Sequence, residues 1–63
     1  MNYYAEALSR AIEVFGSKER AEDWLEKMSA ELGSPPKRLL DTKQGRDRVL
    51  RHIRSVDLAL NMD

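Results

Sequence analysis

A chain of 63 residues forms at most one small domain, and such a domain buries only about 60% of the surface that its unfolded form exposes. The chain has no cysteine and one histidine, which excludes disulfides and thiolate metal sites and leaves no basis for expecting a metal or cofactor. Its net charge is zero, and 41% hydrophobic against 35% charged residues is typical of a folded chain. Additional stability is expected from a dimer or from a partner protein.

No apolar run reaches the roughly 18 residues that a membrane-spanning helix needs. The first residues lack the basic and apolar regions of a signal peptide, so a cytoplasmic location is expected. The charges are unevenly distributed: residues 1–34 are acidic on balance, residues 35–54 are basic, and the last residues are acidic again. This polarity favours orientation-specific association with a second copy or with a partner.

The first predicted helix runs over residues 2–15. Its large apolar side chains recur at steps of four, four and three, which keeps them on one stripe of a helix. The stripe comprises Tyr4, Leu8, Ile12 and Phe15, with Ala5 and Ala11 beside it. Tyr3 lies off this stripe and is expected at an interface. Gly16 follows the last apolar residue, and a glycine in the left-handed conformation there would end the helix.

Ser17 begins the second predicted helix, because its hydroxyl can accept a hydrogen bond from a first-turn amide. The apolar face of this helix is expected to comprise Ala21, Trp24, Leu25 and Met28. Trp24 could also act as a binding hot spot, but its place on this face favours a role in the core. Residues 29–34 are interpreted as a loop in which Leu32 packs under the helices.

The pair Ser34 and Pro35 predicts the start of a short third helix, with a capping hydroxyl followed by a proline at the first helical position. Leu39 and Leu40 of this helix would point inward. Thr42, together with the preceding aspartate, then offers another cap for a further helix.

The final helix is predicted from Lys43 to about Leu60. Its apolar stripe comprises Val49, Ile53, Val56 and Leu60. Gly45 in its first turn permits the close approach of another backbone. No segment alternates apolar and polar residues as a strand would. The sequence therefore predicts an all-α fold, a compact bundle of about four short helices that forms one domain over residues 1–63.

Catalysis is not expected. His52 lies beside the apolar stripe of the last helix and is interpreted as a surface or boundary residue, since nothing beside it supplies a nucleophile. The carboxylate pairs of the second helix, such as Glu22 and Glu26, are interpreted as a solvated face rather than as acid–base machinery. The chain also has no room for a ligand pocket of about 300 Å³. The sequence predicts a protein that is not an enzyme.

The arginines of the last helix raise the alternative of nucleic-acid binding. Arg46 and Arg48 diverge by about 160° on a helix of 3.6 residues per turn, so the arginines do not form one stripe. Zero net charge and the absence of a helix-turn-helix pattern also argue against DNA. Nucleic acid is therefore not expected as a partner, and a solvated face or a patch complementary to an acidic protein surface explains these charges better.

The order of these residues resembles the toxin-binding domain of Xre/MbcA/ParS-type antitoxins over roughly residues 11–56. The strongest part of the resemblance is Val-Phe-Gly-Ser at positions 14–17 with the alanine, tryptophan and leucine of the second helix. The second part is Leu-Leu-Asp-Thr at positions 39–42 with the following glycine and valine. The matching residues also include Glu13, Leu32, Gly33, Pro36 and Ile53.

The resemblance implies an antitoxin of a type II toxin–antitoxin system that binds a RES-type toxin, an NAD-degrading or ADP-ribosylating enzyme. In that family the C-terminal part of the domain can cover the active site of the toxin. An arginine or the terminal carboxylate would then occupy the place of substrate charges. The implied partner-binding residues are Arg46, Arg51, Arg54, Asp57, Leu58, Leu60 and Asp63.

Three differences from the family pattern accompany the resemblance. Only a dozen residues precede the motif, so no helix-turn-helix domain is expected before it. The loop at residues 32–36 is one residue shorter, with Lys37 where an apolar residue is common. The last helix continues where the family often has glycine.

Two alternative functions remain: a self-associating regulatory or assembly module without a toxin partner, and a small nucleic-acid-associated regulator.

Overall fold

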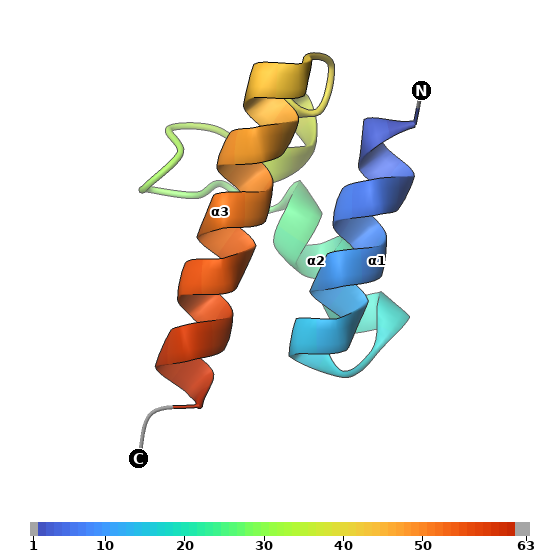
Figure 1. The fold of residues 1–63 in the computed structure, drawn as a ribbon, viewed down its shortest axis with the longest axis vertical. Helices are drawn as coiled ribbons and strands as arrows, with labels where there is room; N and C mark the ends of the chain where they lie inside the picture. The colour runs from blue at the N-terminus through green and yellow to red at the C-terminus, as the bar shows by residue number, and fades with distance from the viewer. Residues whose placement is uncertain (1, 62–63) are drawn as a thin grey trace.

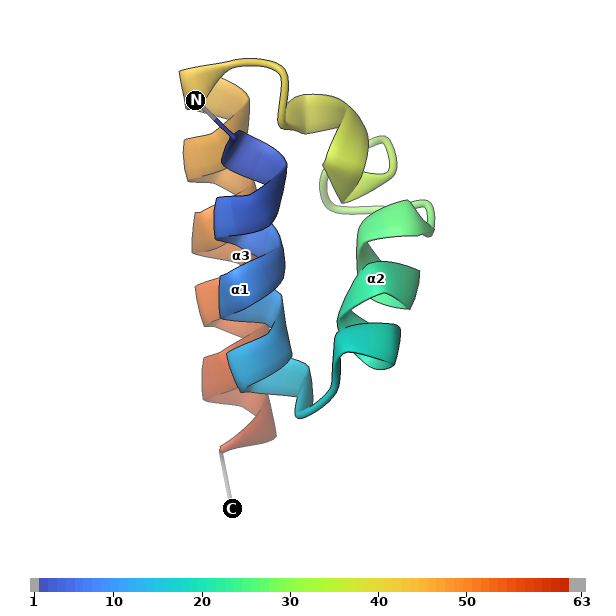
Figure 2. The ribbon, with the colours of Figure 1, turned by 90° about the vertical axis from the view of Figure 1, so that its right-hand side faces the viewer.

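The computed structural model describes residues 2–61. Its elements are α1 (Tyr3–Phe15), α2 (Lys18–Glu26), the 3-10 helix η1 (Pro36–Leu39) and α3 (Lys43–Leu60). α1 and α3 lie side by side and run in the same direction, whereas α2 runs in the opposite direction (Figures 1 and 2). Within the described residues there is no strand, and one isolated bridge pairs Ser29 with Ser34. The all-α prediction is confirmed, but there are three α-helices and a 3-10 turn rather than four helices.

α1 packs against both of the other α-helices and is therefore buried along two flanks. Asn2 caps its start by accepting a hydrogen bond from the amide of Ala5 at 3.0 Å, and Gly16 ends it with a φ of +85°. The predicted stripe faces α2 and is only partly buried. The most buried residues of this helix are Ala7 and Ala11, whose small side chains are fully buried. Tyr3 packs against α3, so the interface expected for it lies within the molecule.

α2 is shorter than its apolar pattern indicated. Ser17 caps its start as predicted, accepting from the amide of Arg20 at 3.2 Å. Ala21 and Leu25 are fully buried. The helix ends at Glu26, and the prediction that Met28 belongs to its buried face is wrong because that side chain is 71% exposed.

The connection from α2 to η1 is a loop, as predicted, and Leu32 packs against the core from it. The predicted start of the third helix is wrong by one residue. Ser34 does not cap the turn, because its hydroxyl donates to the carbonyl of Pro35 at 3.3 Å. The turn begins instead at Pro36, which is fully buried. Packing of this proline ring, rather than a capping side chain, therefore fixes where η1 begins.

α3 has the predicted bounds and the predicted cap: the amide of Gly45 donates to the hydroxyl of Thr42 at 3.0 Å. A Cβ atom at Gly45 would overlap the carbonyl oxygen of Leu39, so the close backbone approach expected here is present. The core is formed by Ala7, Ala11, Ala21, Leu25, Leu40, Val49 and Ile53. In the part of the chain that the structure describes, none of the helices combines the length and apolarity needed to cross a bilayer.

Candidate partner-binding surface on α3

The C-terminal end of α3 extends beyond the end of α1, so its last turns have no helix beside them (Figures 1 and 2). Leu58 and Leu60 in these turns are 59% and 62% exposed. Leu60 continues the stripe of Val49, Ile53 and Val56, and it is exposed because the body of the domain ends before it. Leu58 lies about 160° from Leu60 around the helix axis, so the two leucines do not form one patch.

Asp57 shares this end of the helix and is partly buried. Its carboxylate accepts a hydrogen bond from the side-chain amide of Asn61 at 2.9 Å, and the same amide donates to the Asp57 carbonyl at 3.0 Å. These bonds close the last turn of α3. Asp63, which the sequence placed in the partner-binding surface, lies outside the described residues.

Arg46 lies at the other end of α3 and is engaged within the molecule. Its side chain is 15% exposed, it pairs with Glu6 at 2.6 Å and Asp47 at 2.8 Å, and its guanidinium lies 5.2 Å from the ring centre of Tyr3. The hydrogen bond to Glu6 raises the pKa of Arg46 above its ordinary value, against a smaller opposing effect of burial. The structure therefore does not bring Arg46 together with the other predicted contact residues.

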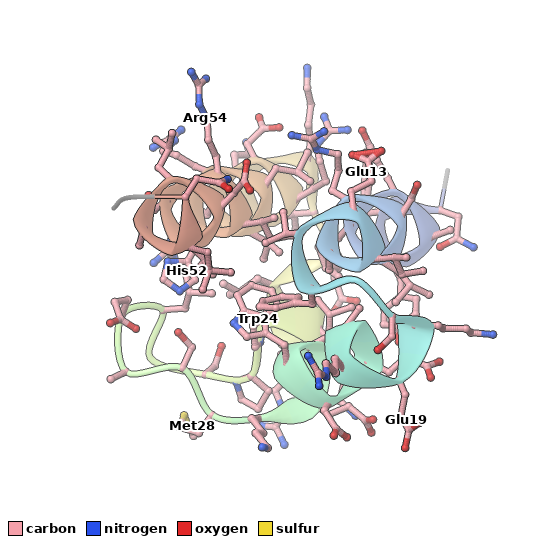
Figure 3. All side chains as sticks on the ribbon, turned by 90° about the horizontal axis from the view of Figure 1, so that it is seen from below. Glu13, Glu19, Trp24, Met28, His52 and Arg54 are labelled. Atoms are coloured by element: carbon pink, nitrogen blue, oxygen red, sulfur yellow. The ribbon has the colours of Figure 1, made fainter. Side chains whose placement is uncertain are left out.

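Arg51 and Arg54 are exposed and take part in none of the ion pairs that the described residues form. Arg54 points away from the body of the domain, on the side opposite α2 (Figure 3). Arg51 is turned further toward the loop that follows α2, where it helps to line a hollow. These two residues are the predicted cations that remain available to a partner.

The hollow lies between α3 and the loop, and sequence reasoning missed it. It is an open depression of about 220 Å³ lined by Glu31, Leu32, Arg48, Arg51, His52 and Ser55. This volume is below the roughly 300 Å³ at which small-molecule sites begin. The spacing of positions 48, 51, 52 and 55 places those side chains on one face of a helix and could have indicated them. The opposite wall could not be found in that way, since it comes from a separate segment.

His52 closes the inner edge of the hollow. Its ring stacks on that of Trp24 with centres 5.6 Å apart, and Trp24 in turn contacts Phe15 at 5.6 Å (Figure 3). The Nε2 atom of His52 lies 3.9 Å from a carboxylate oxygen of Glu31. The prediction of a boundary histidine is confirmed, while Trp24 is a partly buried residue at the edge of the core rather than its centre.

Ser55 is the hydroxyl-bearing residue that shares the hollow with His52. Its Oγ donates to the backbone carbonyl of Arg51 at 3.3 Å, one turn earlier in α3. Since the hydroxyl proton is directed to that carbonyl, Ser55 and His52 are not arranged as a nucleophile and its base. The hollow is therefore a depression lined mostly by polar residues, with Arg48 and Arg51 among them.

Comparison with known proteins gives one family match. The model of the family described as "Antitoxin Xre/MbcA/ParS C-terminal toxin-binding domain" matches residues 10–57. The matched range contains the Gly16–Ser17 joint, α2, η1 and most of α3, and it ends before the two exposed leucines. No curated protein and no solved structure matches the chain.

Proposed function

The chain belongs to the family of Xre/MbcA/ParS antitoxin C-terminal toxin-binding domains, and from this membership we propose that it neutralises a RES-type toxin of a type II toxin–antitoxin system by protein–protein contact. The family match over residues 10–57 is the observation that carries the proposal. The toxin class follows from the resemblance of the sequence. We assign this role to one domain over residues 1–63 that acts without catalysis, and we place the encounter in the cytoplasm, where an NAD-consuming toxin would find its substrate.

The exposed end of α3 supports this proposal. Leu58 and Leu60 are large apolar side chains that remain in water in the isolated chain, and burying them against a partner would be favourable. Arg51 and Arg54 are exposed on the side of α3 that carries Leu58, and arginine is enriched in protein interfaces. We propose that this end covers the opening of the toxin's active site. An arginine would then occupy the place of substrate charges.

Co-expression with a RES-type toxin tests the proposal. The chain should co-purify with that toxin and restore growth of cells that express it. The variants Leu58→Asp and Leu60→Asp should each weaken the complex about tenfold or more, since each would bring a charge into an apolar contact. Their helicity and melting temperature should be unchanged, because both side chains are exposed.

Met28→Asp is the matched control, because Met28 is an exposed apolar residue that lies away from α3 (Figure 3). This variant should bind the toxin like the unchanged chain. Deletion of residues 57–63 should retain the fold and abolish inhibition. A chain that neither binds nor neutralises the toxin would contradict the antitoxin role, and full inhibition by the truncated chain would place the contact elsewhere.

Self-association is the second candidate function, and one observation favours it. Glu19 of α2 and Arg54 of α3 are exposed and point to opposite sides of the molecule, so a carboxylate and a guanidinium are available to different neighbours (Figure 3). Contacts of this head-to-tail kind would join copies of the chain without any toxin. Light scattering after size exclusion, at several protein concentrations, would detect such association. A monomer at all concentrations would remove this alternative.

A further inference from the structure

We propose that the hollow between α3 and the loop receives an acidic side chain of the partner protein, so that the toxin contributes an aspartate or glutamate beside an apolar residue. This inference rests on the proposed function and adds to it a second contact, separate from the exposed leucines. The hollow lies along the middle of α3, whereas Leu58 and Leu60 lie at its end. Arg51 and Leu58 lie on the same side of α3, so a toxin surface along that side would cover the hollow and Leu58, whereas Leu60 would meet another part of the toxin.

Two arginines on the rim of the hollow would bind the acidic side chain. Arg48 and Arg51 are one turn apart on α3, both are exposed, and neither takes part in the ion pairs formed by residues 2–61. A guanidinium presents two parallel N–H groups that match the two oxygens of a carboxylate. Arg46, by contrast, already has its carboxylates in Glu6 and Asp47. Arg54 also forms none of these ion pairs, but it points to another side of α3, so Arg48 and Arg51 are the arginines without a carboxylate partner at the hollow.

Glu31 on the opposite wall leaves the hollow with an excess of positive charge. Its carboxylate lies nearest to His52, at 3.9 Å from Nε2, and accepts from the hydroxyl of Ser29 at 3.5 Å. Two arginines therefore face one carboxylate even when the histidine is neutral. An incoming carboxylate would balance the second arginine. Leu32 adds an apolar surface, which favours an acidic residue with an apolar neighbour over a free anion.

The geometry favours a protein over a nucleic acid as the source of the anion. A phosphate backbone needs several cations aligned along its path. Here Arg54 points to another side of α3, and Arg46 is neutralised within the molecule. Glu31 would repel a run of phosphates at the point where they passed over the hollow. One carboxylate on a short peptide segment can pair with the rim arginines and meets less of this repulsion than a run of phosphates does.

A capped tetrapeptide, acetyl-Leu-Glu-Asp-Leu-amide, provides a probe that does not require the toxin. In amide NMR spectra it should shift the signals of Arg48, Arg51, His52 and Ser55, and it should change the emission of Trp24, the single tryptophan, which stacks on His52. The double variant Arg48→Gln, Arg51→Gln should abolish these shifts. Glu31→Gln should bind the peptide several-fold more tightly, because a competing carboxylate is removed.

Arg38→Gln is the control, since Arg38 is an exposed arginine of η1 that does not line the hollow. It should leave peptide binding unchanged. The inference is overturned if the Gln-Asn version of the peptide binds equally well, if shifts spread evenly over all arginines, or if a short DNA duplex shifts the same residues more strongly. Weaker binding by Glu31→Gln would also overturn it.

The toxin complex separates this inference from the proposed function. Arg48→Gln should weaken the complex about tenfold, mainly through faster dissociation, while Arg38→Gln does not. A toxin that binds the Arg48→Gln variant as tightly as the unchanged chain would overturn the contact but keep the antitoxin role. A chain that binds the peptide in the hollow but no toxin would overturn the antitoxin role, and with it the source of the acidic side chain.

Discussion

The rings of Trp24 and His52 stack with their centres 5.6 Å apart and their planes inclined by 23°. Trp24 comes from α2 and His52 from α3, so the stack joins two helices that are otherwise connected through α1 and η1. Phe15 extends the contact to the end of α1. All three α-helices are therefore linked through one group of rings at the edge of the core.

This stack predicts a measurable coupling between the two residues. Aromatic pairs contribute about 0.5–1.5 kcal/mol beyond the area they bury. A double-mutant cycle with Trp24→Leu and His52→Leu, followed by urea unfolding, should give a coupling free energy in this range. Each single variant should lose stability. Effects that add to within about 0.3 kcal/mol would show that the rings do not interact.

Replacing Gly45 by alanine is expected to change stability in the opposite direction to the same replacement at an ordinary helical glycine. Replacing glycine by alanine inside a helix usually stabilises it by up to about 1 kcal/mol. At this position the new Cβ atom would overlap the carbonyl of Leu39, so Gly45→Ala should destabilise the domain by about 1–3 kcal/mol. Gln44→Ala, one residue earlier and exposed, should stay within about 0.5 kcal/mol of the unchanged chain. Denaturant titrations followed by circular dichroism would compare the two.

Arg46 is expected to stabilise the packing of α1 on α3, and this contribution should depend on salt. Its ion pair with Glu6 crosses between these helices, and its guanidinium lies over Tyr3. Arg46→Met should lower the melting temperature, and the loss should be smaller at high salt because the ion pair is screened. Arg48→Met, at an exposed arginine that forms none of the described ion pairs, is the control. Equal losses in both variants would contradict a specific role for Arg46.

The raised pKa of Tyr4 allows a prediction of how the stability of the domain changes at alkaline pH. Burial, and then the nearby carboxylates of Glu22 and Glu26, raise its pKa above the ordinary value of 10.0. The folded chain therefore holds the phenol proton more tightly than the unfolded chain does. This contribution is fully present below the ordinary pKa and is lost as pH rises through the folded pKa. The free energy of unfolding, measured with urea, should therefore fall less for Tyr4→Phe than for the unchanged chain when pH is raised from below to above that pKa. Equal losses would contradict this.

The joints of the fold could be predicted from the sequence because their signals are local. Ser17 and Thr42 accept from amides three residues ahead, and Gly16 needs only its own left-handed backbone. The short third element was harder, since two adjacent prolines can both begin a helical turn. Burial of the second ring, at Pro36, decides between them, and that packing is formed by residues distant in sequence.

The candidate site was only partly predictable. Arg51 was identified because it lies on the last helix, but Arg48 and Glu31 became site residues only when the loop was placed against α3. Met28 shows the same limit, because the apolar pattern continues past Glu26 although the chain leaves the helix there. Periodicity describes one helix at a time, whereas these features depend on how two segments meet.

The loop over residues 27–35 makes the two walls of the hollow mechanically unequal. One wall is α3, which is fixed by Val49 and Ile53 in the core and by the contact of Gly45 with Leu39. The other wall is held by hydrogen bonds within the loop, such as the Gly33 amide to the Ser29 carbonyl at 2.8 Å, and by the packing of Leu32 against the core. Because the loop is not part of a helix and α3 is anchored in the core, we expect a bulkier guest to displace the loop before it displaces α3, so that the cationic wall keeps its shape and spacing.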